Sequence, residues 1–208
     1  DKYMWLVYGL GIGAEKPNKI YSGWGEVSLD EFLSLDYQSY YGLDFGTASP
    51  SACVEVKYDG NGSFFVRERL YEAMGKIDDT MVTVLKNRIP DMYNQEKMVV
   101  CDSAKSEYVK RLKRAGFFAI SAKKGNNSVE PGIELVRGFK IYTVPYGNTN
   151  SEEDNLRNEY NSYSWETNRL NEVTGNPLKN CLLYTSDAAD DMQCVDLGGR
   201  RIIKKRTN

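Results

Sequence analysis

The sequence predicts an α/β fold, a mixed β-sheet flanked by helices, and three observations support this prediction. Three apolar, strand-like segments come first, at residues 40–46, 52–58 and 63–71. From residue 77 onward, helical patterns alternate with short apolar runs, as in parallel βαβ units. The chain has 208 residues, of which 41% are apolar and 27% charged, so it is long enough to bury a full-sized core.

The first three strands are separated by turn signals. Residues 46–50, Gly-Thr-Ala-Ser-Pro, follow the first strand, and residues 59–62, Asp-Gly-Asn-Gly, follow the second. An Asp-Gly pair between two apolar runs is a strong hairpin signal. We therefore expect three consecutive strands that pair antiparallel.

The second part of the chain alternates helices and strands. A helix is predicted over residues 77–89, because its apolar residues recur at spacings of three and four and Pro90 ends it. Residues 97–102 form a short buried strand with Asp102 at its carboxyl end. Further elements are expected in this order: a helix at 104–116, a strand at 117–122, a helix at 128–139, a strand at 140–146 and a helix at 150–165. Residues 20–36 are expected to form an irregular connector that ends in a short amphipathic turn.

Three antiparallel strands followed by parallel strands make the ribonuclease H-like arrangement. In this arrangement the first strand is central and the fourth lies beside it, so Asp44 and Asp102 meet at one edge of the sheet. Asp44 stands between Leu43 and Phe45, where desolvation of a carboxylate is costly. A hydrogen-bond donor or a cation is therefore expected beside Asp44.

The composition excludes several kinds of site. The chain contains no histidine, which excludes histidine-dependent triads and histidine-ligated zinc within these 208 residues. Its four cysteines have no metal-ligand spacing, and Cys53 and Cys101 lie inside apolar runs typical of reduced core residues. No apolar run approaches the roughly 20 residues of a membrane span.

Positive charge is concentrated in one segment. Residues 97–140 carry ten basic and four acidic residues, a local charge of +6 in a chain whose net charge is −2. Two interpretations are compatible with this asymmetry: a solvated surface with charge pairs on its helices, or a side of the molecule that faces phosphate groups. Composition alone favours the first.

Residues 181–208, CLLYTSDAADDMQCVDLGGRRIIKKRTN, resemble the in-frame translation of a sequencing-library adapter. Two blocks that match the constant arms of such an adapter flank Asp-Met-Gln-Cys, which stands in the place of the adapter's variable index. The segment also lacks helical or strand periodicity. We expect it to be a non-native tail and assign no function to its basic or acidic residues.

Three segments together carry a resemblance to a known family. They are GLDFGTASPSACV (42–54), VVCDSAKSEYVKRLKRAGFFAISAKKGNNSVEPGIELV (99–136) and NLRNEYNSYSW (155–165). In this order and at this spacing they resemble the nuclease domain of the large terminase subunit of tailed phages. The resemblance divides the chain into the end of an ATPase domain with its linker (1–36), an incomplete ribonuclease H-like nuclease domain (37–180) and the adapter-like tail (181–208).

The resemblance implies a DNA endonuclease, a hydrolase that depends on Mg²⁺ or Mn²⁺ and cuts concatemeric double-stranded DNA during genome packaging. Asp44 matches the first and Asp102 the second acidic residue of the family's two-metal site. The third acidic residue lies in a motif with a histidine and an aspartate, shortly after the segment matched by residues 173–180. The tail stands in that place here, so we expect this chain to bind metal weakly and to cut little.

The resemblance also implies partners for the full-length protein. These are double-stranded DNA, the phage portal and the small terminase subunit, in the cytoplasm of the bacterial host and without a membrane. Lys123 and Lys124 match a loop near the family's active face, so we expect contact with the DNA backbone, although a plain surface loop explains either lysine equally well. Glu72 and Glu130 are candidates for outer carboxylates, but surface or capping roles are favoured.

Two alternative functions stay open. Residues 43–49, Leu-Asp-Phe-Gly-Thr-Ala-Ser, also resemble the first phosphate loop of the actin and sugar-kinase superfamily, which binds ATP and shares the strand order. That superfamily needs a second Asp-Gly-Gly-type loop, which residues 97–180 lack. The other alternative is a docking module of the packaging motor that contacts portal or DNA without cutting. A transposase or integrase is disfavoured, because its acidic residues are typically Asp, Asp and Glu in a different motif context.

Overall fold

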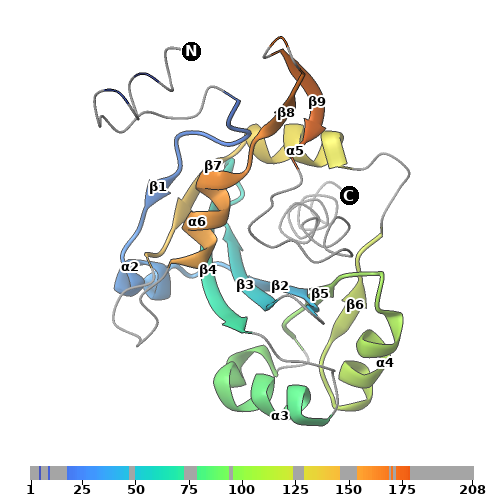
Figure 1. The fold of residues 1–208 in the computed structure, drawn as a ribbon. Helices are drawn as coiled ribbons and strands as arrows, with labels where there is room; N and C mark the ends of the chain where they lie inside the picture. Colours follow the sequence, from blue (N-terminus) through green and yellow to red (C-terminus); the bar gives the residue numbers. More distant parts are fainter. Residues whose placement is uncertain are drawn as a thin grey trace.

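A computed structural model gives the fold of the chain (Figure 1). It describes residues 5, 9, 18–46, 50–72, 79–93, 96–123, 129–145, 154–168, 170 and 172–178. The strands are β1 (Gly25–Glu26), β2 (Ser39–Asp44), β3 (Ser51–Tyr58), β4 (Ser63–Glu72), β5 (Val99–Cys101), β6 (Ala119–Ser121), β7 (Lys140–Thr143), β8 (Trp165–Thr167) and β9 (Val173–Pro177). The helices are α2 (Leu29–Ser34), α3 (Asp79–Arg88), α4 (Ser106–Arg114), α5 (Val129–Arg137) and α6 (Asn155–Ser162), with a 3₁₀ turn, η2, at Pro90–Met92.

Seven of these strands form one mixed sheet in the order β1-β7-β4-β3-β2-β5-β6. Strand β3 is antiparallel to β2 and β4, and all other neighbouring pairs in this sheet are parallel. Strands β8 and β9 pair separately as an antiparallel hairpin. The predicted fold class, a ribonuclease H-like mixed sheet flanked by helices, is therefore confirmed.

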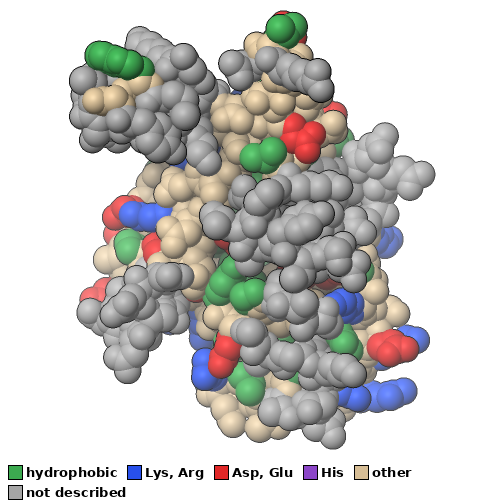
Figure 2. Space-filling model, viewed as in Figure 1, with side chains coloured by type: hydrophobic (Ala, Val, Ile, Leu, Met, Phe, Trp, Pro, Cys, Tyr) green, Lys and Arg blue, Asp and Glu red, His purple; other side chains and the backbone are tan. Residues whose placement is uncertain are grey.

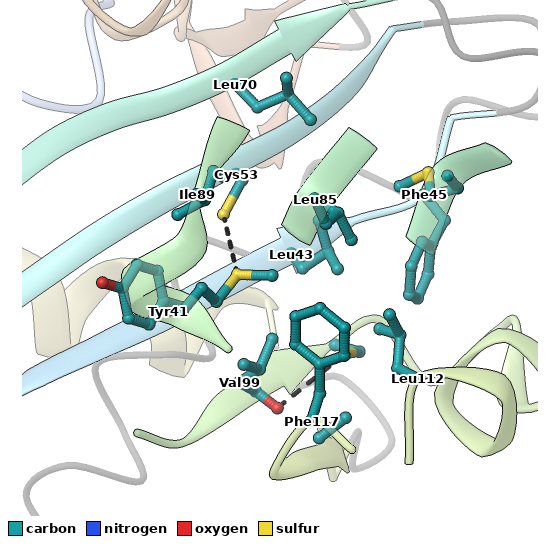
Figure 3. Packing of buried hydrophobic residues seen from close by; sticks show 14 of the residues in the cluster. Tyr41, Leu43, Phe45, Cys53, Leu70, Leu85, Ile89, Val99, Leu112 and Phe117 are labelled. Atoms are coloured by element: carbon teal, nitrogen blue, oxygen red, sulfur yellow. Dashed lines mark hydrogen bonds between the residues drawn. The ribbon is translucent and has the colours of Figure 1, made fainter. Parts of the chain in front are cut away.

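One core lies between the sheet and helices α3 and α4 (Figure 3). Tyr41 and Leu43 of β2 and Phe45, the residue directly after it, lie in this core, because alternate side chains of an extended chain share one face. Leu85 of α3 and Leu43 are both fully buried there. This packing fixes the middle of β2 and thereby the position of the residue at its carboxyl end.

A second core covers the opposite face of the sheet. It joins the side chains of β4 to helices α5 and α6, which lie together in the upper part of Figure 1. Ile133 of α5 is fully buried, and Trp24 stacks on Tyr160 of α6 with ring centroids 3.8 Å apart. Because both faces are covered, the sheet meets solvent mainly at its edges and at the ends of its strands.

The two cysteines predicted to be core residues are free and buried. Cys53 Sγ lies 3.8 Å from Met92 Sδ in the core against α3 (Figure 3). Burial raises the pKa of Cys53 to about 12. Both thiols therefore stay protonated at neutral pH and serve as small apolar groups.

A β-bulge in β4 interrupts the strand predicted over residues 63–71 at an arginine. Cys53 pairs with Leu70 but Val54 pairs with Glu68, so Arg69 is the extra residue. The Arg69 guanidinium donates to both carboxylate oxygens of Asp91 at 2.7 and 2.8 Å. The bulge therefore ties the edge of β4 to η2.

This arginine is part of a larger, half-buried polar network. Arg69 also donates to Glu55 Oε2 at 2.6 Å, and the Tyr41 hydroxyl donates to Asp91 Oδ2 at 2.5 Å. Burial opposes ionisation of Asp91, but the bonds from Arg69 and Tyr41 outweigh it and hold the pKa of Asp91 well below its usual range. The network links β2, β3, β4 and η2 to one another.

The structure differs from the sequence prediction at residues 20–36. The connector supplies β1 at the edge of the sheet, which was not predicted, and the short helix α2 lies at the predicted amphipathic turn. Ser28 caps α2 by accepting from the Glu31 amide, and Lys57 Nζ donates to the carbonyls of Phe32 and Leu35 at its other end. Strand β1 has only two residues, which are too few for a periodic pattern of apolar residues to be recognised in the sequence.

Two predicted helix starts shift along the chain. Helix α4 begins at Ser106, two residues after the predicted start at 104, with Lys105 at the N-cap and no side-chain cap. Helix α6 begins at Asn155 with Asp154 as its cap, and residues 150–153 of the predicted helix lie outside the described residues. Across the described ranges, no helix is long and apolar enough to cross a membrane.

Candidate active site

The candidate site lies where two neighbouring parallel strands end. Leu43 of β2 is in register with Cys101 of β5, and the Asp102 amide donates to the Leu43 carbonyl at 3.1 Å. Asp44 and Asp102 each follow one member of this pair. The strand order thus brings together two carboxylates that are far apart in the sequence, as the sequence analysis expected.

The surroundings of the two carboxylates are largely closed to solvent. Asp102 is fully buried, and neither of its side-chain oxygens is accessible to solvent. Asp44 is partly exposed, although its Oδ1 is buried. Two carboxylates side by side repel each other, and burial strengthens that repulsion by lowering the effective dielectric constant. A bound cation at this edge would relieve it.

The turn that follows Asp44 is held by a buried hydroxyl. Ser51, at the start of β3, is fully buried, and its Oγ accepts from the Gly46 amide at 3.2 Å. Asp44 pairs across the strands with Ala52, the residue after Ser51. Ser51 therefore fixes the exit of the chain from β2. The sequence analysis missed this role, whose one signal is a serine directly after the turn.

Lys123 lies at the same edge as the two aspartates. Cys101 of β5 is in register with Ser121 of β6, so Lys123 comes just beyond the level of Asp102 on the next strand, and its side chain is exposed. Lys124, the other lysine predicted to contact DNA, lies outside the described residues. The structure thus brings one of the two predicted lysines to the candidate site.

Glu72 and Glu130, the other acidic candidates, lie outside this pair of strand ends. Glu72 ends β4, separated from β2 by β3, and its Oε2 forms an ion pair with Arg88 Nη1 at 2.7 Å. Glu130 is exposed in the first turn of α5. Among the residues that the structure describes, no group of three or more His, Cys, Asp and Glu side chains could hold a metal ion. The predicted ligand set therefore comprises Asp44 and Asp102 alone.

Two neighbouring carboxylates suit a hard divalent cation. Mg²⁺ and Mn²⁺ prefer oxygen ligands, and Mg²⁺ is commonly held by one or two carboxylates together with water and substrate phosphate. Asp44 and Asp102 match this donor chemistry, and the exposed lysine beside them suits an anionic substrate. Beyond Leu178 the chain lies outside the described residues, and the expected place of the third acidic residue falls there.

Comparison with known proteins gives structural matches only. No protein-family model and no curated protein matches the sequence. The nuclease domain of the g2p large terminase from bacteriophage SPP1, solved with bound Mn, is 20% identical with a TM-score of 0.64, over 86% of this chain and 94% of that one. The large terminase of a thermophilic bacteriophage is 18% identical with a TM-score of 0.62, over 93% of this chain and 47% of that one.

Another crystal form of the same thermophilic-phage terminase is 19% identical with a TM-score of 0.60, over 94% of this chain. The match covers 45% of the terminase in that form, so this chain spans about half the length of the whole protein. Identities this low show a shared fold. The chain therefore has the fold of phage large-terminase nuclease domains, which is the fold that the sequence resemblance implies.

Proposed function

We propose that this chain is the nuclease domain of a phage terminase large subunit, which cuts concatemeric double-stranded DNA during genome packaging. One observation carries the proposal: Asp44 and Asp102 follow residues paired in register on two neighbouring parallel strands. The shared fold with terminase nuclease domains supports it. The ATP-binding and docking alternatives have no comparable observation in their favour.

Asp44 and Asp102 are the proposed ligands of Mg²⁺ or Mn²⁺. A divalent cation bound there would supply activation of the attacking water and stabilisation of the leaving oxygen of a phosphodiester. The SPP1 domain was solved with bound Mn, which supports the choice of metal. The protein's own contribution is to hold the two carboxylates together through the β2–β5 pairing and to fix the turn after Asp44 through Ser51.

In this proposal, the chain lacks one of the metal ligands. A two-metal site in this family uses a third acidic residue, and the described residues hold no cluster of three. Without the third carboxylate, less negative charge is available to hold the cation. We therefore propose that this 208-residue chain binds metal weakly and cuts DNA poorly, whereas a chain with the third acidic residue cuts.

The remaining features of the proposal concern DNA and partners. Lys123 and Lys124 would contact the phosphate backbone without reading sequence. The whole protein would act with the portal and the small terminase subunit in the cytoplasm of the bacterial host. The domain division at residues 36 and 180 belongs to the same proposal.

Plasmid nicking tests the proposed function. Supercoiled plasmid is incubated with the purified chain in Mn²⁺, and DNA binding is measured in parallel by electrophoretic mobility shift. We expect DNA binding with little nicking, and any residual nicking disappears in Asp44→Asn while DNA binding is kept. Asp30→Asn, an exposed acidic change on α2, serves as the control and leaves both readouts unchanged.

Two outcomes would contradict separate parts of the proposal. Strong Mn²⁺-dependent nicking that requires Asp44 would overturn the predicted inactivity but support the nuclease assignment. Absence of DNA binding, or nicking that is unchanged in Asp44→Asn, would overturn the assignment itself.

A further inference from the structure

Helix α4 carries a dense group of basic side chains on its outer side. Val109 and Leu112 are buried against the core, whereas Lys110, Arg111, Lys113 and Arg114 are exposed. We name these four exposed residues the α4 basic face. Glu107 is the one acidic residue of this nine-residue helix. The buried pair accounts for the packing of α4, so packing leaves the basic side chains unexplained.

Most of these charges are not neutralised by the acidic side chains that the structure describes. The ion pairs found there join Arg67 and Arg69 to Glu55, and others join the basic residues of other elements to nearby acids. None of these pairs involves Lys110, Lys113 or Arg114. The helix dipole favours cations in the last turn. Lys110 lies before that turn, so the dipole does not account for it.

Helix α4 begins near the candidate site, and its basic face lies towards its other end. Helix α4 starts four residues after Asp102, so its first turn lies at the edge where the carboxylates meet. The helix also contacts β6, which ends just before Lys123. Figure 2 shows Lys and Arg side chains at the lower right of the molecule, where Figure 1 draws α4. Lys123 thus lies near the candidate site, and the α4 basic face lies further along the helix that begins there.

The size of this surface suits a DNA backbone. The five residues from Lys110 to Arg114 extend over roughly 7 Å at about 1.5 Å per residue, which equals about two base pairs along a DNA duplex at roughly 3.4 Å per base pair. Duplex DNA carries one negative charge per about 1.7 Å of its axis, so a helix with four exposed cations complements it.

We propose that the α4 basic face binds the phosphate backbone of the DNA duplex next to the position that is cut. This inference rests on the proposed function for the identity of the substrate. The contact orients the duplex relative to Asp44 and Asp102 and is independent of sequence, because it reaches phosphates only.

Salt-dependent DNA binding by the purified chain tests this inference. Binding is measured by fluorescence anisotropy with two duplexes of about 30 base pairs and unrelated sequence, between about 50 and 200 mM salt. Three proteins are compared: the wild type, K110Q/R114Q and the matched control R137Q/K140Q. Arg137 and Lys140 are exposed on α5 and β7, away from α4. Circular dichroism and thermal unfolding check that all three proteins are folded.

We expect the affinity of K110Q/R114Q for DNA to be about tenfold lower than that of the wild type at roughly 100 mM salt. The slope of log Kd against log salt concentration should be smaller by roughly 2, and both effects should be equal for the two duplexes. The control stays within about twofold of the wild type. Wild-type affinity and slope in K110Q/R114Q would overturn the inference while leaving the proposed function intact. No duplex binding by the wild type at any salt concentration would overturn both.

Discussion

The amide of Asp102 donates a hydrogen bond to the carbonyl of Leu43 at 3.1 Å, which joins the ends of β5 and β2. This bond continues the parallel register in which Leu43 is opposite Cys101. Because Asp44 follows Leu43, the same bond sets Asp44 and Asp102 beside each other. The candidate site is therefore a direct consequence of how two buried strands pair.

Asp102→Asn is expected to abolish stabilisation of the chain by Mn²⁺. A ligand present at about ten times its dissociation constant stabilises a folded protein by about 1.4 kcal/mol. Thermal unfolding of the wild type therefore shifts upward as Mn²⁺ is added, and the shift disappears when one of two proposed ligands is removed. Asp30→Asn should retain the wild-type shift. A shift that persists in Asp102→Asn would place the bound metal elsewhere.

Ser51→Ala is expected to weaken both the fold and the candidate site. The change removes the acceptor of the Gly46 amide and leaves a buried donor without its bond, which costs about 1–3 kcal/mol. Because Ser51 holds the turn after Asp44, the Mn²⁺-dependent shift in unfolding temperature should also become smaller.

Ser39→Ala is the matched control for Ser51→Ala. Ser39 is buried at the opposite end of β2 and donates to Glu55 Oε1 at 2.7 Å. We expect it to lower the unfolding temperature but to leave the Mn²⁺ shift unchanged. An equal reduction of the Mn²⁺ shift in both variants would show that Ser51 acts through global stability alone.

Asp91→Asn is expected to lower stability at pH 7 and to matter less as the pH falls. The pKa of Asp91 is held below its usual 3.8, so the folded state binds fewer protons than the unfolded state at acidic pH. The stabilisation is therefore complete above about pH 5 and is lost progressively as the pH falls below 3.8.

Urea unfolding at pH 7 and pH 3 measures this difference. At pH 7 the free energy of unfolding should drop by about 1–2 kcal/mol, the lower part of the range for bonds to charged groups, because 38% of the Asp91 side chain is exposed. At pH 3 the difference between variant and wild type should narrow. A constant difference across this range would mean that Asp91 stabilises the fold without its charge.

Leu85→Ala is expected to destabilise the chain by about 2–5 kcal/mol, because the side chain is fully buried between α3 and the sheet and its removal leaves a cavity. Leu33→Ala, at a position that is 57% exposed on α2, should change the free energy of unfolding by less than about 0.5 kcal/mol. Urea unfolding curves of the two variants measure the contrast. Similar losses would contradict the assignment of the core.

The elements that the sequence predicts well are those with a clear hydrophobic period. Strands β2 to β5 and helices α3 and α4 combine apolar runs or three-four spacing with turn residues at their ends, so local pattern and tertiary packing agree. The proximity of Asp44 and Asp102 was predictable for the same reason. Once the order of strands is known, the ends of neighbouring parallel strands must meet.

The features that the sequence does not reveal depend on contacts between distant residues. The bulge at Arg69 follows from its partners Glu55 and Asp91, which a strand pattern does not encode. The two residues of β1 form a strand only because β7 offers them a parallel edge. Ser51 looks like any turn residue until its bond to Gly46 is seen.

Anomalous scattering from crystals of the wild-type chain grown with Mn²⁺ tests the central claim most directly. The account predicts a manganese peak within bonding distance of the carboxylates of both Asp44 and Asp102, and loss of that peak in Asp102→Asn. A manganese ion bound elsewhere, with none between these two carboxylates at saturating Mn²⁺, would contradict it.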